Sequence, residues 1–323
     1  MNILNSVQAK KILKPKWSNL MPVLILIALF IIMVILQPKT FSLYYIGIKF
    51  DNALPLMFLA AGQTLVLISG GIDLSVGGVM SLTTSMLATM QLNPIIVILL
   101  TLMMGIAVGI INGLIIEKLN IQPIIVTLGM WTILGGVSFL FLDMDGGVIN
   151  DTLHSVMTSK ILNIPLSFYL TAGLVILWYL IKNSRFGYTM FAIGSNEKAA
   201  YCTGINIFAS KIKIYAVCGL FSALAGIIYA GQIGSGSPSV GNNNILLSVA
   251  AAVIGGTSLS GGRGSITGAI IGVFIFKIIS DVLLFAGIPS FWVQLFQGII
   301  LIVCVALSSL YSSIKSRAGE QID

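Results

Sequence analysis

The stretch 185–213 reads RFGYTMFAIGSNEKAAYCTGINIFASKIK, and it is the only long polar interval between strongly apolar segments of the chain. Its single acid is Glu197, and its basic side chains are Arg185, Lys198, Lys211 and Lys213. A loop rich in basic residues between membrane spans stays on the cytoplasmic side. The stretch therefore predicts a membrane protein in which residues 182–213 form a cytoplasmic loop.

Inside this loop the residues predict a short helix outside the bilayer. Asn196 is a favoured N-cap residue, Glu197 suits the first turn beside the positive end of the helix dipole, and Gly204 can end the helix. The helix is either a docking element for a partner or an ordinary capped cytoplasmic helix, and the loop alone does not separate these two interpretations.

The composition excludes a soluble globular domain. Hydrophobic residues make up 57% of the 323 residues, charged residues 8%, and the mean hydropathy is +1.04, whereas soluble domains carry about a quarter charged residues. The net charge of +7 is spread over short loops, which gives no continuous basic face for nucleic acid. No phosphate-binding loop, metal-ligand cluster or catalytic set appears, so we expect no enzyme, no cofactor and no metal site.

Apolar segments predict an all-α, polytopic transmembrane bundle, because a span needs about 20 mostly apolar residues. Two shorter and more polar segments, Val76–Met90 and Ile245–Leu259, bring the total to about ten spans or are broken or re-entrant helices. The clear candidates are Leu20–Leu36, Asn52–Ser69, Pro94–Ile116, Ile124–Leu142, Ile164–Ile181, Ile212–Ala230, Ile266–Ala286 and Pro289–Leu310.

The charges at the chain ends predict that both termini are cytoplasmic. Four lysines precede the first span, and Lys315 and Arg317 follow the last. The loop 143–163 carries three aspartates against Lys160, which suits the outside. We therefore expect a cytoplasmic N-terminal segment (1–19), a transmembrane domain (20–310) and a cytoplasmic tail (311–323).

An internal repeat is visible in two glycine-rich stretches. Residues 70–77 read GGIDLSVG and align without gaps onto residues 255–262, GGTSLSGG, with five of eight positions identical. The match is either a duplicated bundle, as in many transporters, or chance similarity between glycine-rich turns. The polar and small residues of both stretches are candidates for the translocation path or a gate: Gly71, Asp73, Ser75, Gly77, Gly256, Ser258, Ser260 and Arg263.

Ionisable residues inside apolar segments are expensive and mark functional candidates. Asp73 can cap the helix that begins near Val76 by accepting backbone N–H bonds, or it can contact a substrate. Lys277 and Asp281 stand four residues apart, which places them on one helix face as a structural ion pair or as part of a gate.

Three motifs now carry a resemblance to a family. The run from Asn196 to Ala200, followed by GIN at 204–206, resembles the coupling loop of ABC-importer permeases: an acidic residue, two alanines and a glycine four residues later. The stretches GGIDLSVG and GGTSLSGGRGSITGAIIG resemble two other hallmarks of the branch that imports ribose, galactose and xylose. This chain departs from the pattern at Lys198, where glutamate is usual, and at 245–248, where no acid precedes the second turn.

The resemblance implies a permease subunit of a sugar importer in the bacterial inner membrane, surrounded by lipid. It implies three partners: an ABC ATP-binding subunit, a periplasmic or extracellular sugar-binding protein and a second permease subunit. The residues that it assigns to ATPase coupling are Gly194, Asn196, Glu197, Ala199, Ala200 and Gly204. The alternative is an ion-coupled secondary transporter that uses Asp73 or the pair Lys277 and Asp281.

Overall fold

The computed structural model describes residues 17–289, 291–293, 295–299 and 302. Among the described residues the regular elements are helices, apart from one two-stranded antiparallel hairpin and one isolated bridge, so the predicted all-α fold is confirmed. The elements are α2 (Trp17–Leu36), η1 (Pro38–Thr40), α3 (Leu43–Ile68), α4 (Ser75–Thr89), α5 (Pro94–Leu119), α6 (Pro123–Phe141), α7 (Asp151–Met157), β1 (Lys160–Ile161), β2 (Ile164–Pro165), α8 (Leu166–Lys182), α9 (Arg185–Ser195), α10 (Glu197–Cys202), α11 (Ile207–Ile233), α12 (Val240–Ile254) and α13 (Ile266–Phe285).

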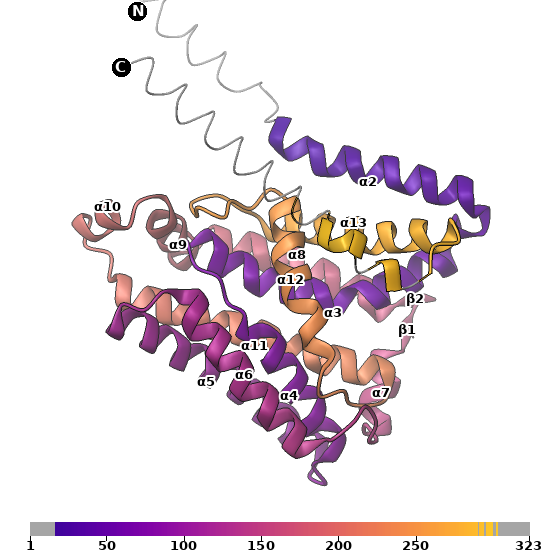
Figure 1. The fold of residues 1–323 in the computed structure, drawn as a ribbon, viewed down its shortest axis with the longest axis horizontal. Helices are drawn as coiled ribbons and strands as arrows, with labels where there is room; N and C mark the ends of the chain where they lie inside the picture. Colours follow the sequence, from indigo (N-terminus) through magenta and orange to yellow (C-terminus); the bar gives the residue numbers. More distant parts are fainter. Residues whose placement is uncertain (1–16, 290, 294, 300–301, 303–323) are drawn as a thin grey trace, which may run out of the picture.

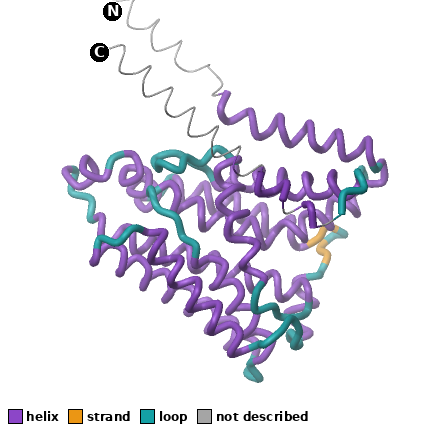
Figure 2. The backbone as a smooth tube through the Cα atoms, viewed as in Figure 1, coloured by secondary structure: helices purple, strands orange, loops and turns teal. Residues whose placement is uncertain are grey.

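The long helices run between two distinct ends of the molecule (Figure 1). Helices α9 and α10 lie at one end, on the left of the view, and α7 with the hairpin lies at the other. Helix α3 is the most enclosed span, with 89% of its apolar window buried. Helix α11 packs against α3, α4 and α5 and so joins the centre to the periphery. Most loops lie toward the two ends, whereas the segment that connects α3 to α4 runs through the middle of the view (Figure 2).

Length and composition identify five described helices that can cross a membrane: α3, α5, α6, α11 and α13. A sixth span results if α8 and α9 form one span with a 72° bend, and α12 together with residues 21–36 of α2 are shorter apolar helices. The predicted count of about ten and the side of the termini are not tested by this. Residues 1–16 of the predicted N-terminal segment, the predicted tail 311–323 and more than half of Pro289–Leu310 lie outside the described residues, whereas residues 17–19 belong to α2.

Several helices begin or end at other residues than the predicted apolar segments, and the structure gives the reason. Helix α3 begins at Leu43 instead of Asn52, because Ser42 caps it by accepting the N–H of Tyr45 at 3.2 Å. Helix α12 covers 240–254 instead of 245–259, because a glycine-rich turn ends it at Ile254. Residues 185–195, expected to be part of a loop, form α9, capped by Ser184.

Glycines bring α5 and α11 into direct backbone contact. A Cβ atom placed on Gly109 would overlap the carbonyl oxygen of Tyr215, and one on Gly105 would lie 2.5 Å from the carbonyl oxygen of Gly219. A Cβ atom on Gly113 would likewise lie 2.7 Å from the Cα of Ile212. Small residues allow such close approach where no hydrophobic effect drives helices together in lipid. The spacing G-x-x-x-G-x-x-x-G on α5 therefore builds the interface with α11.

Candidate functional site

The predicted short helix of the basic loop is present as α10. The Asn196 side chain accepts the N–H of Ala199 at 3.0 Å, which satisfies one free donor of the first turn. Gly204 has φ +82°, a left-handed conformation that favours glycine, and its N–H bonds the carbonyl of Tyr201 at 2.9 Å. Asn196 and Gly204 thus bound the helix as the sequence predicts.

Helix α10 projects from its end of the molecule (Figure 1). Glu197, Lys198 and Ala199 are exposed, whereas Ala200 is buried beneath them. Tyr201 leaves 72% of its surface uncovered. An exposed aromatic side chain beside exposed charged side chains, at the end of a helix, forms a surface that a partner protein can bind.

One lysine ties α10 to the body of the protein. The ammonium of Lys211, on α11, lies 2.9 Å from a carboxylate oxygen of Glu197 and 2.9 Å from one of Glu117. Glu117 belongs to the last turn of α5, so three elements meet at one cation. Sequence reasoning missed Lys211 and Glu117 as site residues.

The end of α9 touches both glycine-rich turns. A Cβ atom on Gly194 would overlap the carbonyl oxygen of Ile68 and would lie 2.6 Å from the amide nitrogen of Gly262. These two groups also bond each other, since the Gly262 N–H donates to the Ile68 carbonyl at 2.9 Å. A Cβ atom on Gly261 would lie 3.2 Å from the Cα of Gly70. The three motifs that are far apart in the sequence therefore meet at one point.

The two turns share a helix-ending geometry, with a correction to the predicted register. Gly70 has φ +88° and Gly256 has φ +93°. In each turn the N–H of this glycine donates to the carbonyl three residues before it, and the N–H of the next residue donates to the carbonyl five residues before itself. The structural equivalent of Gly70 is thus Gly256, whereas the gapless alignment pairs Gly70 with Gly255. The register differs because Ser69 occupies the C-cap position in the first copy and Gly255 occupies it in the second.

Asp73 is buried and accepts the first N–H of α4. One of its carboxylate oxygens lies 2.9 Å from the Ser75 nitrogen and 2.6 Å from the Ser75 hydroxyl, which in turn accepts a bond from Asn112 at 2.8 Å. The Gln63 amide, in the orientation that satisfies both of its ends, bonds the Asp73 backbone carbonyl at 2.9 Å and nitrogen at 3.3 Å. This geometry fits the capping interpretation of Asp73.

A cleft of about 280 Å³ lies between the basic loop and the first glycine-rich turn. Of the predicted site residues, it brings together Gly71, Gly194, Asn196, Glu197 and Ser260. The other path candidates lie apart from it. Ser75 and Gly77 are buried, and Gly77 packs on Ile245 of α12, while Gly256 and Arg263 are exposed and Ser258 is partly exposed.

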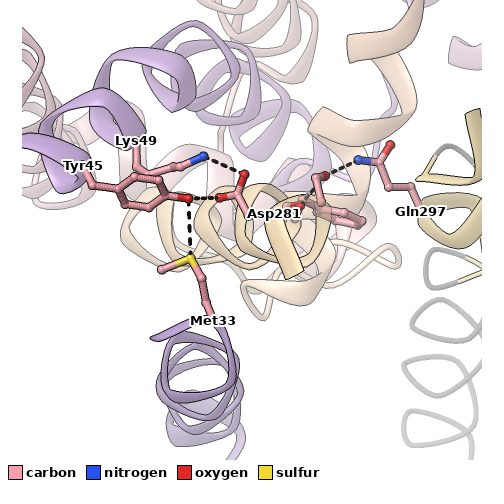
Figure 3. A network of polar contacts seen from close by, with 7 residues as sticks. Met33, Tyr45, Lys49, Asp281 and Gln297 are labelled. Carbon is pink, nitrogen blue, oxygen red and sulfur yellow. Dashed lines mark hydrogen bonds and ion pairs between the residues drawn. The ribbon is translucent and has the colours of Figure 1, made fainter. Parts of the chain in front are cut away.

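The predicted ion pair of Lys277 with Asp281 is not formed within the described part of the chain. The Asp281 carboxylate instead bonds the Lys49 ammonium at 2.6 Å and the Tyr45 hydroxyl at 3.2 Å (Figure 3). The i, i+4 spacing places Lys277 on the same helix face, but Lys49 reaches the carboxylate across the α3–α13 interface. Tyr45 also contacts the sulfur of Met33, at 3.8 Å, and so connects α2 to this cluster.

Two sequence signals could have found the missed residues. Placing the start of the span at Asn52 left Lys49 in a loop, although an acid inside an apolar helix needs a cation near it. The glycine spacing at 105, 109 and 113 is a known signature of close helix packing and is plain in the sequence. Lys211 and Glu117 carry no such signal, because their meeting depends on the tertiary fold.

Comparisons with known proteins identify the family of the chain. Residues 51–305 match the model of the family described as "Branched-chain amino acid transport system / permease component". The chain is 37% identical to the "Ribose import permease protein RbsC" of Bacillus subtilis (strain 168), over 77% of this chain and 80% of that protein. It is 31% identical to the protein of the same name from Escherichia coli (strain K12), over 90% and 93%.

A third relative carries a different solute in its name. The chain is 33% identical to the "Galactose/methyl galactoside import permease protein MglC" of Escherichia coli (strain K12), over 88% of this chain and 92% of that protein. No solved structure matches the chain. The family match spans both glycine-rich turns, α10 and all five long apolar helices except the first turns of α3. The chain therefore belongs to the family of permease components of transport systems, as its three motifs predict.

Proposed function

We propose that this chain is the permease subunit of an ABC importer and carries a monosaccharide or a similar small solute across the bacterial inner membrane. The family match and the names of the relatives support the role of an import permease and the class of solute. Hydrolysis of ATP belongs to a separate subunit, since we find no phosphate-binding loop in the sequence.

The observation that carries the mechanism is the meeting of α9 with both glycine-rich turns at Gly194. The ATP-binding subunit grips α10, and its closure displaces α10 and α9 together. Because Gly194 leaves no space between the backbones of Ile68 and Gly262, the displacement passes to both turns. The turns join α3 to α4 and α12 to α13, so these four helices switch between outward- and inward-open states.

The remaining partners take other surfaces. A solute-binding protein delivers the solute at the opposite end, where α7 and the hairpin β1–β2 lie (Figure 1). A second permease subunit completes the path, and lipid covers the exposed apolar side chains of α5 and α6. The loop 182–213 then faces the cytoplasm, with both termini on the same side.

The ion-coupled alternative finds no support. The relatives are import permeases of the same family. The carboxylates that it would use already have partners, because Asp73 bonds Ser75 and Asp281 bonds Lys49. In place of a coupling-ion site, the geometry at Asp73 favours a helix cap.

The test is affinity purification of the tagged chain in mild detergent, with the partners identified by mass spectrometry. We expect an ATP-binding protein in equal amount with the chain, and its loss in Gly204→Trp, which puts a bulky side chain beside α10. The matched control is Gly287→Trp: Gly287 also has φ +82° and open space around it, but it follows α13 at the other end. A chain that purifies without an ATP-binding protein, and that transports in liposomes under an ion gradient alone, would contradict the proposal.

A further inference from the structure

The cation that holds α10 has two unequal partners. Lys211 lies 2.9 Å from Glu117 and 2.9 Å from Glu197, but the two carboxylates differ in exposure. The Glu117 side chain is 13% exposed, the Lys211 side chain 17%, and the Glu197 side chain 52%. The inner pair, Lys211 with Glu117, thus joins α11 to α5. The outer pair, Lys211 with Glu197, joins α11 to α10, the helix that the proposed mechanism moves. Only the outer carboxylate is open to a partner protein.

This inequality matters for a helix that has to move. Removing one member of a buried ion pair is strongly unfavourable because it leaves a charge without compensation. When α10 shifts, however, Lys211 keeps Glu117, and the exposed Glu197 passes to water or to a basic group of the docking subunit. The outer pair can therefore open and close without leaving a buried charge alone.

Lys211 is also connected to the first glycine-rich turn through Tyr215. Tyr215 stands four residues further along α11, on the same helix face. Its hydroxyl is buried and lies against Gly71, where a Cβ atom would overlap it. The cleft of about 280 Å³ that Lys211, Glu197 and Tyr215 line lies beside this contact and gives α10 room to shift.

We propose that Lys211 is the positioning residue that couples α10 to the glycine-rich turns, with Glu197 as the releasable arm and Glu117 as the fixed arm. This inference rests on the proposed function. Closure of the ATP-binding subunit draws Glu197 away from Lys211, and its reopening restores the pair. Through Tyr215 and the packing of α11 on α5, Lys211 transmits the same displacement that Gly194 transmits from α9.

The experiment measures solute carried per ATP hydrolysed in proteoliposomes that contain the complete transporter with its co-purified ATP-binding subunit, with labelled D-ribose as the probe. Lys211→Met should lower this ratio roughly fivefold or more, within the usual range of coupling between two sites. Lys211→Arg should keep most of it. The matched control is Lys118→Met, which removes an exposed lysine next to Glu117.

A second variant keeps the test valid if Lys211→Met fails to fold. Lys211→Glu combined with Glu117→Lys and Glu197→Lys reverses all three charges and preserves both pairs. It should recover the ratio that Lys211→Glu alone loses, which a purely electrostatic steering of the partner would not allow.

Each outcome separates the coupling role from its alternatives. A Lys211→Met protein whose uptake and ATP hydrolysis fall together, in proportion to folded protein, would overturn the inference, because that pattern indicates a structural role. An unchanged ratio would also overturn it while leaving the proposed function intact. If the unaltered chain carries no ATP-binding subunit, the proposed function fails first, and the coupling role fails with it.

Discussion

The contact of Gly194 with the two turns gives the sharpest prediction, through the substitution Gly194→Ala. In an ordinary helix this change is stabilising by up to about 1 kcal/mol, because alanine has the higher helix propensity. Here the added methyl group overlaps the Ile68 carbonyl and comes within 2.6 Å of the Gly262 nitrogen. The three atoms nearest to the added methyl group are backbone atoms of Ile68 and Gly262, so no side chain can rotate away to make space.

The expected loss follows from two terms. Forcing a methyl group into a closed contact destabilises by about 1–3 kcal/mol. The methyl group would also break the hydrogen bond from the Gly262 N–H to the Ile68 carbonyl, which is 2.9 Å long. Leaving these two backbone groups unpaired lowers the free energy of unfolding by about a further 1–3 kcal/mol. The sum of about 2–6 kcal/mol exceeds the gain in propensity. After that gain the net loss is at least about 1 kcal/mol, and since 1.4 kcal/mol is a factor of ten in an equilibrium, we expect uptake to fall at least about fivefold.

The assay compares uptake of labelled ribose in cells with the amount of chain in the membrane and with thermal unfolding in detergent. The matched control is Gly129→Ala on α6, a helical glycine whose Cβ position has no neighbour within 4 Å. Gly194→Ala should lose uptake while Gly129→Ala keeps it. If both variants transport and unfold alike, α9 does not press on the turns and the proposed mechanism is wrong.

Three further predictions concern stability and capping. Breaking a buried ion pair typically destabilises by about 3–5 kcal/mol, and Lys49→Met should fall at the lower end of this range because both side chains keep some exposure. In thermal unfolding, adding Asp281→Asn should recover part of the lost stability. Gly109→Ala should lower stability in detergent by about 1–3 kcal/mol, whereas Gly135→Ala, which has no neighbour within 4 Å, should not; equal stability would refute the close α5–α11 contact. Asp73→Ala should weaken the start of α4 by about 0.5–2 kcal/mol, while Asp73→Asn keeps the acceptor and most uptake; equal loss in both variants would show that the charge itself is needed.

The parts of the site that the sequence predicts are those decided locally. An asparagine that can cap, a glutamate in the first turn and a glycine that can adopt positive φ lie within nine residues, from Asn196 to Gly204, and their chemistry acts through the backbone next to them. The same holds for Asp73 and the start of α4. These features need no knowledge of how the helices pack.

The parts that the sequence does not predict depend on tertiary contacts. Nothing near Gly194 indicates that its neighbours are Ile68 and Gly262, because both arrive from distant segments. The partner of Asp281 was missed because the spacing to Lys277 follows from one helix, whereas Lys49 comes from another. The register of the two turns was off by one, because glycine identity alone does not tell a C-cap from the residue after it.

The glycine contact between α5 and α11 has a consequence for how the protein is made. Gly105 is synthesised 114 residues before Gly219, its facing residue (219 − 105). At roughly 5–20 residues per second, α5 enters the membrane about 6–23 s before its partner exists. During that interval its glycine face meets only lipid or the insertion machinery, and any earlier helix with small residues competes for it. During biogenesis α5 therefore stays without its packing partner until α11 is made. Slower translation of the segment 120–206 should raise the fraction of chain that is degraded before it assembles.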